Sequence, residues 1–187
     1  AIFRGSAVAA DSVMAKASPA YNPNVKKYDQ NIEKAKELLK EAGYPNGLDL
    51  QLWVMDDGPR VDMCVIIQDQ LKAVGINIEI KVFEFGAYVS KTALPDKELY
   101  FLSWNSSGDG DASLYPLFHS TQHGASGNRS FYSNKEIDAL LDKARTSVNQ
   151  DERTEIYKKV QDILQEELPH YTLVYPKLNL AKSTKVK

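Results

Sequence analysis

The order of apolar and polar residues predicts alternating strands and helices in the middle of the chain. Strict alternation over residues 48–54 and again over 76–82 predicts two strands, each with one covered face. Between them, apolar residues recur at helical spacing over 59–74, and Gly75 suits a left-handed helix end. A strand, a helix and a second strand predict a right-handed crossover, which places the two strands parallel in one sheet.

Further elements are predicted on both sides of this unit. Asn31 and Gly43 suit the two ends of a helix, and capping boxes begin helices at Ser133–Glu136 and Asn149–Glu152. The first 28 residues follow neither period and predict an irregular segment laid over other elements. The remaining predictions are helices over 31–43, 85–94, 133–147 and 150–168 and strands over 99–104 and 171–175.

Composition and charge limit the class of protein. The 187 residues, 43% of them hydrophobic, are enough for one α/β domain with a sizeable core. A net charge of −2 creates no field that would attract nucleic acid or an anionic membrane, so we expect no nucleic-acid partner. The first residues lack the basic start and long apolar core of a signal peptide, and we expect any such signal outside this chain. A single cysteine, Cys64, excludes an internal disulfide, and its helical position predicts burial.

The strand over 99–104 ends on a tryptophan and opens into a loop of small polar and acidic residues. Ligands of α/β proteins bind at such strand ends. An indole face beside hydrogen-bonding groups suits a polar organic ligand with apolar parts, although the same tryptophan is equally well explained as a core residue. The candidate binding residues of this loop are Trp104, Asn105, Ser106, Ser107, Asp109 and Asp111.

Charged groups around this loop allow two interpretations each. Asp109 or Asp111 can pair with a ligand ammonium, or they can cap a helix that starts near Asp111. Arg60 follows the end of the neighbouring predicted strand and can clamp a carboxylate with its two-pronged guanidinium. The alternative for Arg60 is a solvated arginine in the first turn of a helix.

The patterns of common enzyme and metal sites are absent from the sequence. It contains no phosphate-binding glycine loop and no Gly-x-Ser-x-Gly elbow. His119 and His123 are four residues apart, but the residues between and after them favour a loop over a two-ligand helical face. The twelve-residue calcium loop is also missing. We therefore predict no catalytic residues, no metal and no cofactor.

Four blocks of the sequence together resemble a known family. They are Asn31-x-Glu-Lys-Ala-Lys-Glu-Leu-Leu-Lys-Glu-Ala-Gly-Tyr-Pro-Asn-Gly47, Gln70-Leu-Lys-Ala-Val-Gly-Ile-Asn-Ile-Glu-Ile80, Trp104 and its loop with Pro116-Leu-Phe118, and Tyr132-Ser-Asn-Lys-Glu-Ile-Asp-Ala-Leu-Leu141. In this order they resemble the family 5 extracellular solute-binding proteins, the dipeptide, oligopeptide, glutathione and nickel receptors of ABC importers. The similarity extends over nearly the whole chain.

The resemblance implies a receptor rather than an enzyme. We expect an α/β fold, a single lobe of a bilobed periplasmic-binding-protein-like fold of class C, with a mixed sheet flanked by helices. Residues 1–28 would form an irregular crossing segment from a missing first lobe, and residues 29–187 the second, C-terminal, ligand-binding lobe. The implied partners are a peptide or peptide-like ligand, an ABC permease in the membrane and the missing N-terminal lobe. The implied location is the periplasm or the extracellular face of the membrane, with a lipid anchor in a Gram-positive cell.

One position of the loop departs from the family pattern. In peptide-binding relatives, an aspartate three residues after the matching tryptophan pairs with the α-ammonium of the peptide. Here that position is Ser107, so an ammonium anchor would have to come from Asp109 or Asp111. The loop resembles the glutathione-receptor branch more than the dipeptide branch.

Two other classes of function remain open on the residues alone. A small hydrolase would use Asp109, Asp111 and a histidine such as His119. An interaction module would dock a partner on the helices over 133–147 and 150–168, and it would need an apolar face on them that is left exposed.

Overall fold

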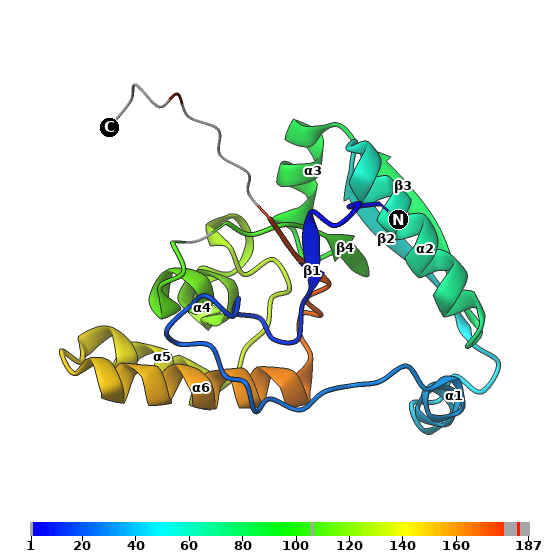
Figure 1. The fold of residues 1–187 in the computed structure, drawn as a ribbon. Coiled ribbons are helices and arrows are strands. Elements are labelled where there is room, and N and C mark those ends of the chain that lie inside the picture. The colour runs from blue at the N-terminus through cyan, green and yellow to red at the C-terminus, as the bar shows by residue number, and fades with distance from the viewer. Residues whose placement is uncertain (1, 106, 178–182, 184–187) are drawn as a thin grey trace.

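A computed structural model describes residues 2–105, 107–177 and 183 of the protein (Figure 1). Two groups of elements, each with its own core, are joined through a pair of short strands. The first group contains β2 (Leu48–Met55), α2 (Gly58–Lys72), β3 (Ile76–Phe83), α3 (Phe85–Thr92) and β4 (Leu99–Phe101). The second group contains α4 (Gly110–Phe118), α5 (Lys135–Thr146) and α6 (Gln150–Glu167). The short strands are β1 (Ala7–Ala9) and β5 (Val174–Pro176), and α1 (Ile32–Glu41) lies apart at one end.

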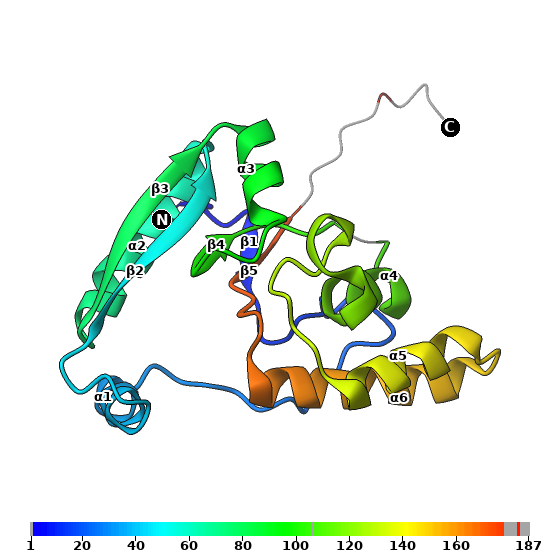
Figure 2. The same ribbon diagram turned by 180° about the vertical axis from the view of Figure 1, so that it is seen from behind.

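The first group is the predicted crossover unit. Its strands follow the order β3-β2-β4 and are all parallel, and β2 and β3 pair along their full length. Helix α2 covers one face of β2 and β3, as the opposite views of Figures 1 and 2 show. Alternating residues of the strands, such as Leu52, Val54 and Ile78, pack against α2. The predicted parallel arrangement is therefore confirmed.

Cys64 lies in this core. It is fully buried and free, as its position in the helical pattern predicts. Burial raises the pKa of its thiol to about 11, because a thiolate would lose its hydration there. The thiol is therefore uncharged and unreactive at neutral pH.

Strand β4 is shorter than predicted. The prediction of a strand over 99–104 is wrong at its last three residues, since β4 ends at Phe101. Its partner β2 ends at Met55, one residue beyond Val54, which pairs with Phe101. A longer β4 would have almost no backbone left to pair with, and the chain turns away toward the helices.

The second group is held together by the apolar faces of its helices. Ile137 and Leu141 of α5 and Val160 of α6 are completely buried, together with Leu114 of α4. Asn149 caps α6 as predicted, by accepting hydrogen bonds from the amides of Asp151 and Glu152. The cap of α5 is Asn134 rather than Ser133, the first residue of the predicted capping box. No helix in the described part of the chain is long and apolar enough to cross a membrane.

The first 28 residues are more ordered than the sequence predicts. They contain β1, which pairs antiparallel with β5, and this pairing was not predicted. Strand β5 itself is confined to Val174–Pro176, instead of the predicted 171–175. A strand of three residues is too short to show an alternating pattern, and the distant partner supplies the hydrogen bonds that define it.

Gln161 of α6 joins this opening segment to the helices. Its side-chain oxygen accepts hydrogen bonds from Ser12 Oγ at 2.9 Å and from the Asn22 amide at 3.2 Å. Its Nε2 donates to the carbonyl oxygens of Ala20 and Tyr157 at 2.7 and 2.9 Å. The side chain is 1% exposed, so all four groups depend on one another for hydrogen bonds.

We expect Gln161→Met to lower the free energy of unfolding by about 3 kcal/mol, because it leaves buried donors and acceptors without partners. The measurement is urea unfolding followed by circular dichroism. The matched control is Gln165→Met, one turn along α6, where the side chain forms no hydrogen bond with a described residue. Equal effects of the two substitutions would contradict the role of the network.

Two glycines, Gly47 and Gly75, let the two backbone segments approach closely where the chain enters β2 and β3. Gly47 has a φ of 81°, and a Cβ atom there would lie 1.9 Å from the carbonyl oxygen of Gly75. The same oxygen accepts a hydrogen bond from the Leu48 amide at 3.2 Å. The backbones approach too closely for any side chain at position 47.

We predict that Gly47→Ala destabilises the protein by about 3 kcal/mol or more, through this clash and the unfavourable φ together. Gly43→Ala separates the two effects, because Gly43 has a φ of 91° but a Cβ atom there would meet no other atom within 4 Å. It should cost only about 1 kcal/mol. Thermal unfolding measures both, and a loss at position 47 no larger than that at position 43 would be inconsistent with the contact.

Candidate functional site

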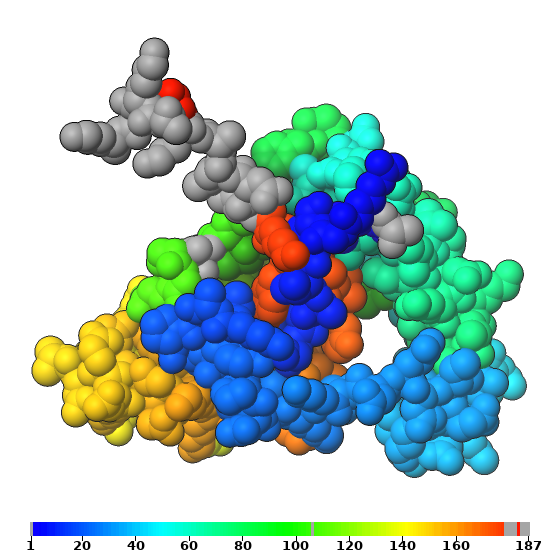
Figure 3. Space-filling model, viewed as in Figure 1, coloured from blue at the N-terminus to red at the C-terminus, as the bar shows by residue number. Residues whose placement is uncertain are grey.

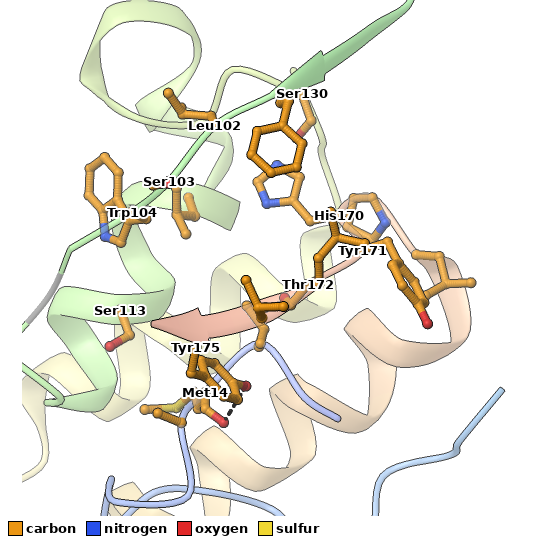
Figure 4. Close-up of a pocket in the computed structure, with 18 of the residues that line it drawn as sticks. Met14, Leu102, Ser103, Trp104, Ser113, Ser130, His170, Tyr171, Thr172 and Tyr175 are labelled. Carbon is orange, nitrogen blue, oxygen red and sulfur yellow. Dashed lines mark hydrogen bonds between the residues drawn. The ribbon is translucent and has the colours of Figure 1, made fainter. Parts of the chain in front are cut away.

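A hollow of about 1940 Å³ lies between the two groups of elements. Its wall includes the end of β4 and the following loop, the first turn of α2, and the segment from Leu168 to Lys177. Figure 3 shows an opening in the surface between α1, α2 and the segment that leads to β5. Figure 4 shows Trp104 and Ser103 on one side of this space and His170 on the other.

Trp104 belongs to the wall of the hollow and not to either core. Its side chain is 43% exposed, and its indole Nε1 donates to the carbonyl oxygen of Ala112 at 3.3 Å. This bond ties the loop to the first turn of α4. The interpretation of Trp104 as a core residue therefore does not hold, and its ring is available to a ligand.

The parallel sheet brings Arg60 to the same end of the hollow. Its Nη2 donates to Ser103 Oγ at 3.1 Å, and its Nη1 forms an ion pair with Asp57. Arg60 thus links the first turn of α2 to the residue before Trp104. The two strand ends that the sequence pattern places next to each other do meet in the structure.

The loop carboxylates are both engaged by the protein itself. Asp109 caps α4 by accepting a hydrogen bond from the Asp111 amide at 2.9 Å, and it lies 3.6 Å from Arg153. Asp111 forms an ion pair with Arg145 at 3.1 Å. The helix-capping interpretation therefore describes Asp109, and neither carboxylate is free to act as a ligand anchor without giving up a partner.

The remaining loop candidates lie along the rim. Asn105 and Ser107 are exposed and line the hollow. Ser106 lies outside the described residues. The third residue after Trp104 is thus a serine, Ser107, whose hydroxyl lies at the rim of the hollow.

The residues of the alternative hydrolase are far apart. Asp109 precedes the first residue of α4 and His119 follows its last, so a helix of nine residues, roughly 13 Å long, separates them. His119 is 4% exposed, stacks on Tyr115 and lies with its Nε2 3.4 Å from Asp142. A nucleophile, a base and an orienting acid are not assembled here.

The histidine pair does not form a metal site either. His123 Nε2 lies 2.9 Å from the carbonyl oxygen of Tyr132, and His119 accepts a hydrogen bond from the Thr121 amide. Within the described ranges, no group of three or more histidine, cysteine or acidic residues is placed to hold a metal ion. Both histidines serve the turns between α4 and α5.

The helices of the alternative interaction module use their apolar faces internally. Ile156, Tyr157 and Leu164 of α6 pack against α4 and α5 in the second core. A docking face on α5 and α6 would require such residues to be exposed, and they are buried.

The sequence pattern does not predict that four polar residues meet in this wall. Tyr100 Oη lies 3.0 Å from His170 Nε2, and burial lowers the pKa of His170 to about 4. Arg129 and Lys97 lie nearby in the same wall. No spacing in the sequence joins these residues, which are brought together by the packing of β4, the loop before α5 and the segment before β5.

Comparisons with known proteins agree with this architecture. The family model described as "Bacterial extracellular solute-binding proteins, family 5 Middle" matches residues 1–125. The glutathione-binding protein GsiB of Escherichia coli K12 is 35% identical to this chain over an alignment of 189 positions. The alignment covers 97% of this chain and 37% of GsiB. The chain thus spans little more than a third of the length of this relative.

Solved structures show the same fold. The periplasmic binding protein DppA from Helicobacter pylori, in complex with the peptide STSA, has a TM-score of 0.86 and 35% identity over 92% of this chain and 34% of DppA. NikZ from Campylobacter jejuni, in complex with Ni(L-His), has a TM-score of 0.83 and 27% identity over 91% of this chain and 37% of NikZ. The chain belongs to the bacterial extracellular solute-binding proteins of family 5.

Proposed function

We propose that the chain is the second, ligand-binding lobe of the substrate-binding component of an ABC importer. The complete receptor would capture a peptide or peptide-like solute between two lobes and deliver it to a membrane permease. The observation that carries the proposal is the hollow at the carboxyl ends of parallel strands, where Trp104 and Arg60 converge. In this division, residues 1–28 cross from the first lobe and residues 29–187 form the second.

The state of the charged groups supports binding over catalysis. The carboxylates of the Trp104 loop are held by the helix N-terminus and by arginines, so they are not poised to transfer protons. The exposed indole offers an apolar face, and the exposed Asn105 and Ser107 offer hydrogen bonds. Such a wall holds a polar organic molecule without changing it.

The names of the relatives favour a peptide-like solute. GsiB is named for glutathione, which is itself a peptide, and the DppA structure contains the peptide STSA. In the proposed complex, Trp104 covers an apolar part of the ligand and Arg60 donates a hydrogen bond to one of its oxygen atoms. Ser107 accepts or donates a neutral hydrogen bond at the position of the ammonium anchor in peptide-binding relatives.

Unpartnered apolar side chains support the proposal that further polypeptide completes the receptor. Helix α1 has no buried residue, and Leu38 on it is 51% exposed. Val65 and Ile66 of α2 are also about half exposed, at 49% and 48%. In the full receptor, closure of the two lobes about a hinge would enclose the ligand, and the closed form would dock on the permease. A Gram-positive cell would hold such a receptor at its surface by a lipid anchor.

The proposal predicts that the 187-residue chain binds a peptide at least about a hundredfold more weakly than the complete receptor, because one wall supplies only part of the contacts. Isothermal titration calorimetry with the same peptide measures both. The ligand for this comparison is identified by native mass spectrometry of the gently purified receptor. Equal affinities would show that the binding site does not require a second lobe.

Replacing the indole should weaken binding directly. We expect Trp104→Ala to reduce the affinity of the complete receptor for that peptide at least about tenfold, since buried aromatic anchors contribute strongly to binding. Trp53→Phe is the control, because Trp53 is a buried residue of β2 whose ring packs on Phe83 and does not line the hollow. Unchanged affinity in Trp104→Ala, with an unchanged melting temperature, would remove this loop from the site.

A further inference from the structure

Arg129 is a buried cation without an acidic partner. It is 9% exposed and lies in the loop before α5. Its Nη1 donates to the carbonyl oxygen of Val89 at 2.7 Å and to Thr92 Oγ1 at 2.9 Å, at the C-terminal end of α3. Among the described residues it forms no ion pair, and its Nε and Nη2 have no hydrogen-bond partner.

Three other arginines of the protein are arranged differently. Arg60, Arg145 and Arg153 each lie beside an aspartate. The Nε and Nη2 of Arg129 keep some contact with solvent, yet no described acid forms an ion pair with this mostly buried guanidinium. The carboxyl-terminal end of α3 offsets only part of the charge on Arg129. Its unused donors can bind an anion that enters the hollow.

A second cation, Lys97, lines the hollow beside Arg129. Its Nζ lies 4.9 Å from the ring centre of Phe131 and 5.3 Å from that of Tyr100, and it donates to the Leu94 carbonyl oxygen at 2.6 Å. Burial and the charge of Arg129 lower the pKa of Lys97, while the nearby Asp96 opposes this shift. The two cations therefore repel each other, and an anion between them would relieve that repulsion.

An unfavourable backbone conformation at Phe131 helps to position its ring beside Lys97. Phe131 has a φ of 55°, a left-handed conformation that is unfavourable for an aromatic residue. This turn places its ring against Lys97, two residues after Arg129. Glu98, which follows Lys97 in sequence and also lines the hollow, is exposed and accepts a hydrogen bond from the Gln51 amide on the sheet.

We propose that Arg129 and Lys97 form a binding site for a carboxylate of the transported solute, separate from the Trp104 and Arg60 end of the hollow. The proposal rests on the receptor function proposed above. Lys97 precedes β4 and Trp104 follows it, so the two ends are separated by at least the length of this strand, on the order of 10 Å. A ligand that reaches both would be an extended molecule with an acidic group at one end.

The 187-residue chain tests the site itself, with acetate and acetamide as probes at constant ionic strength. We expect the side-chain Nε–H signal of Arg129 in an NMR titration to shift and saturate with acetate and not with acetamide. Lys97→Gln should weaken the acetate response at least about threefold. Arg145→Gln is the matched control, because Arg145 pairs with Asp111 and does not line the hollow. Equal responses to the two probes, or no effect of Lys97→Gln, would overturn the proposal.

The complete receptor tests whether the carboxylate belongs to the solute. We expect a peptide with a free carboxyl terminus to bind at least about tenfold more tightly than its amide, and this preference to fall in Arg129→Gln and in Lys97→Gln. A preference that disappears only in Arg60→Gln would assign the carboxylate to the other end and overturn the proposal. Equal binding of acid and amide would also overturn it, while leaving the receptor function intact.

Two further outcomes need their own interpretation: loss of all peptide binding, and a variant that does not fold. Binding of neither peptide would count against the receptor function itself. If Arg129→Gln fails to fold because it no longer holds the end of α3, Lys97→Gln decides the question, since the Lys97 ammonium donates to only one described residue, Leu94.

Discussion

Three paired residues hold β4 on the sheet, at the point where the chain passes from the first group of elements to the second. Leu99, Tyr100 and Phe101 of β4 pair with residues near the C-terminal end of β2, and the chain then leaves the sheet for the helices. The position of the Trp104 loop in the wall of the hollow depends on this short pairing. It sets the point where the Trp104 loop begins, and it brings that loop to Arg60 at the end of the neighbouring strand.

Contacts outside the sheet reinforce this junction. Tyr88 of α3 donates to the carbonyl oxygen of Phe101 at 2.7 Å, and Arg129 binds the end of the same helix. On the opposite side, Gln161 fastens the first residues to α6, and β1 pairs with β5. The wall of the hollow is therefore built from segments far apart in sequence, held by backbone and buried polar contacts rather than by one continuous core.

Charge pairing divides the charged groups in and beside the wall of the hollow into two kinds. Asp109 and Asp111 are used within the protein, which explains why a loop rich in acids has no catalytic arrangement. Arg129 and Lys97 have no acidic partner among the described residues. Charged groups that lack an oppositely charged partner inside the protein are the ones that a ligand can pair with, and this distinction follows from three-dimensional contacts alone.

The sequence by itself determined the elements with strong local signals. Alternation defined β2 and β3, helical spacing and caps defined α1, α2, α5 and α6, and the strand order near Trp104 correctly placed Arg60 beside its loop. It could not determine β1, the early end of β4 or the grouping of Tyr100, Arg129 and His170. Those features depend on partners many residues away, and a chain of three residues or a single buried side chain has no periodicity of its own. Local backbone preference and amphipathic spacing are properties of the sequence, whereas burial and pairing of individual polar groups exist only once the chain has folded.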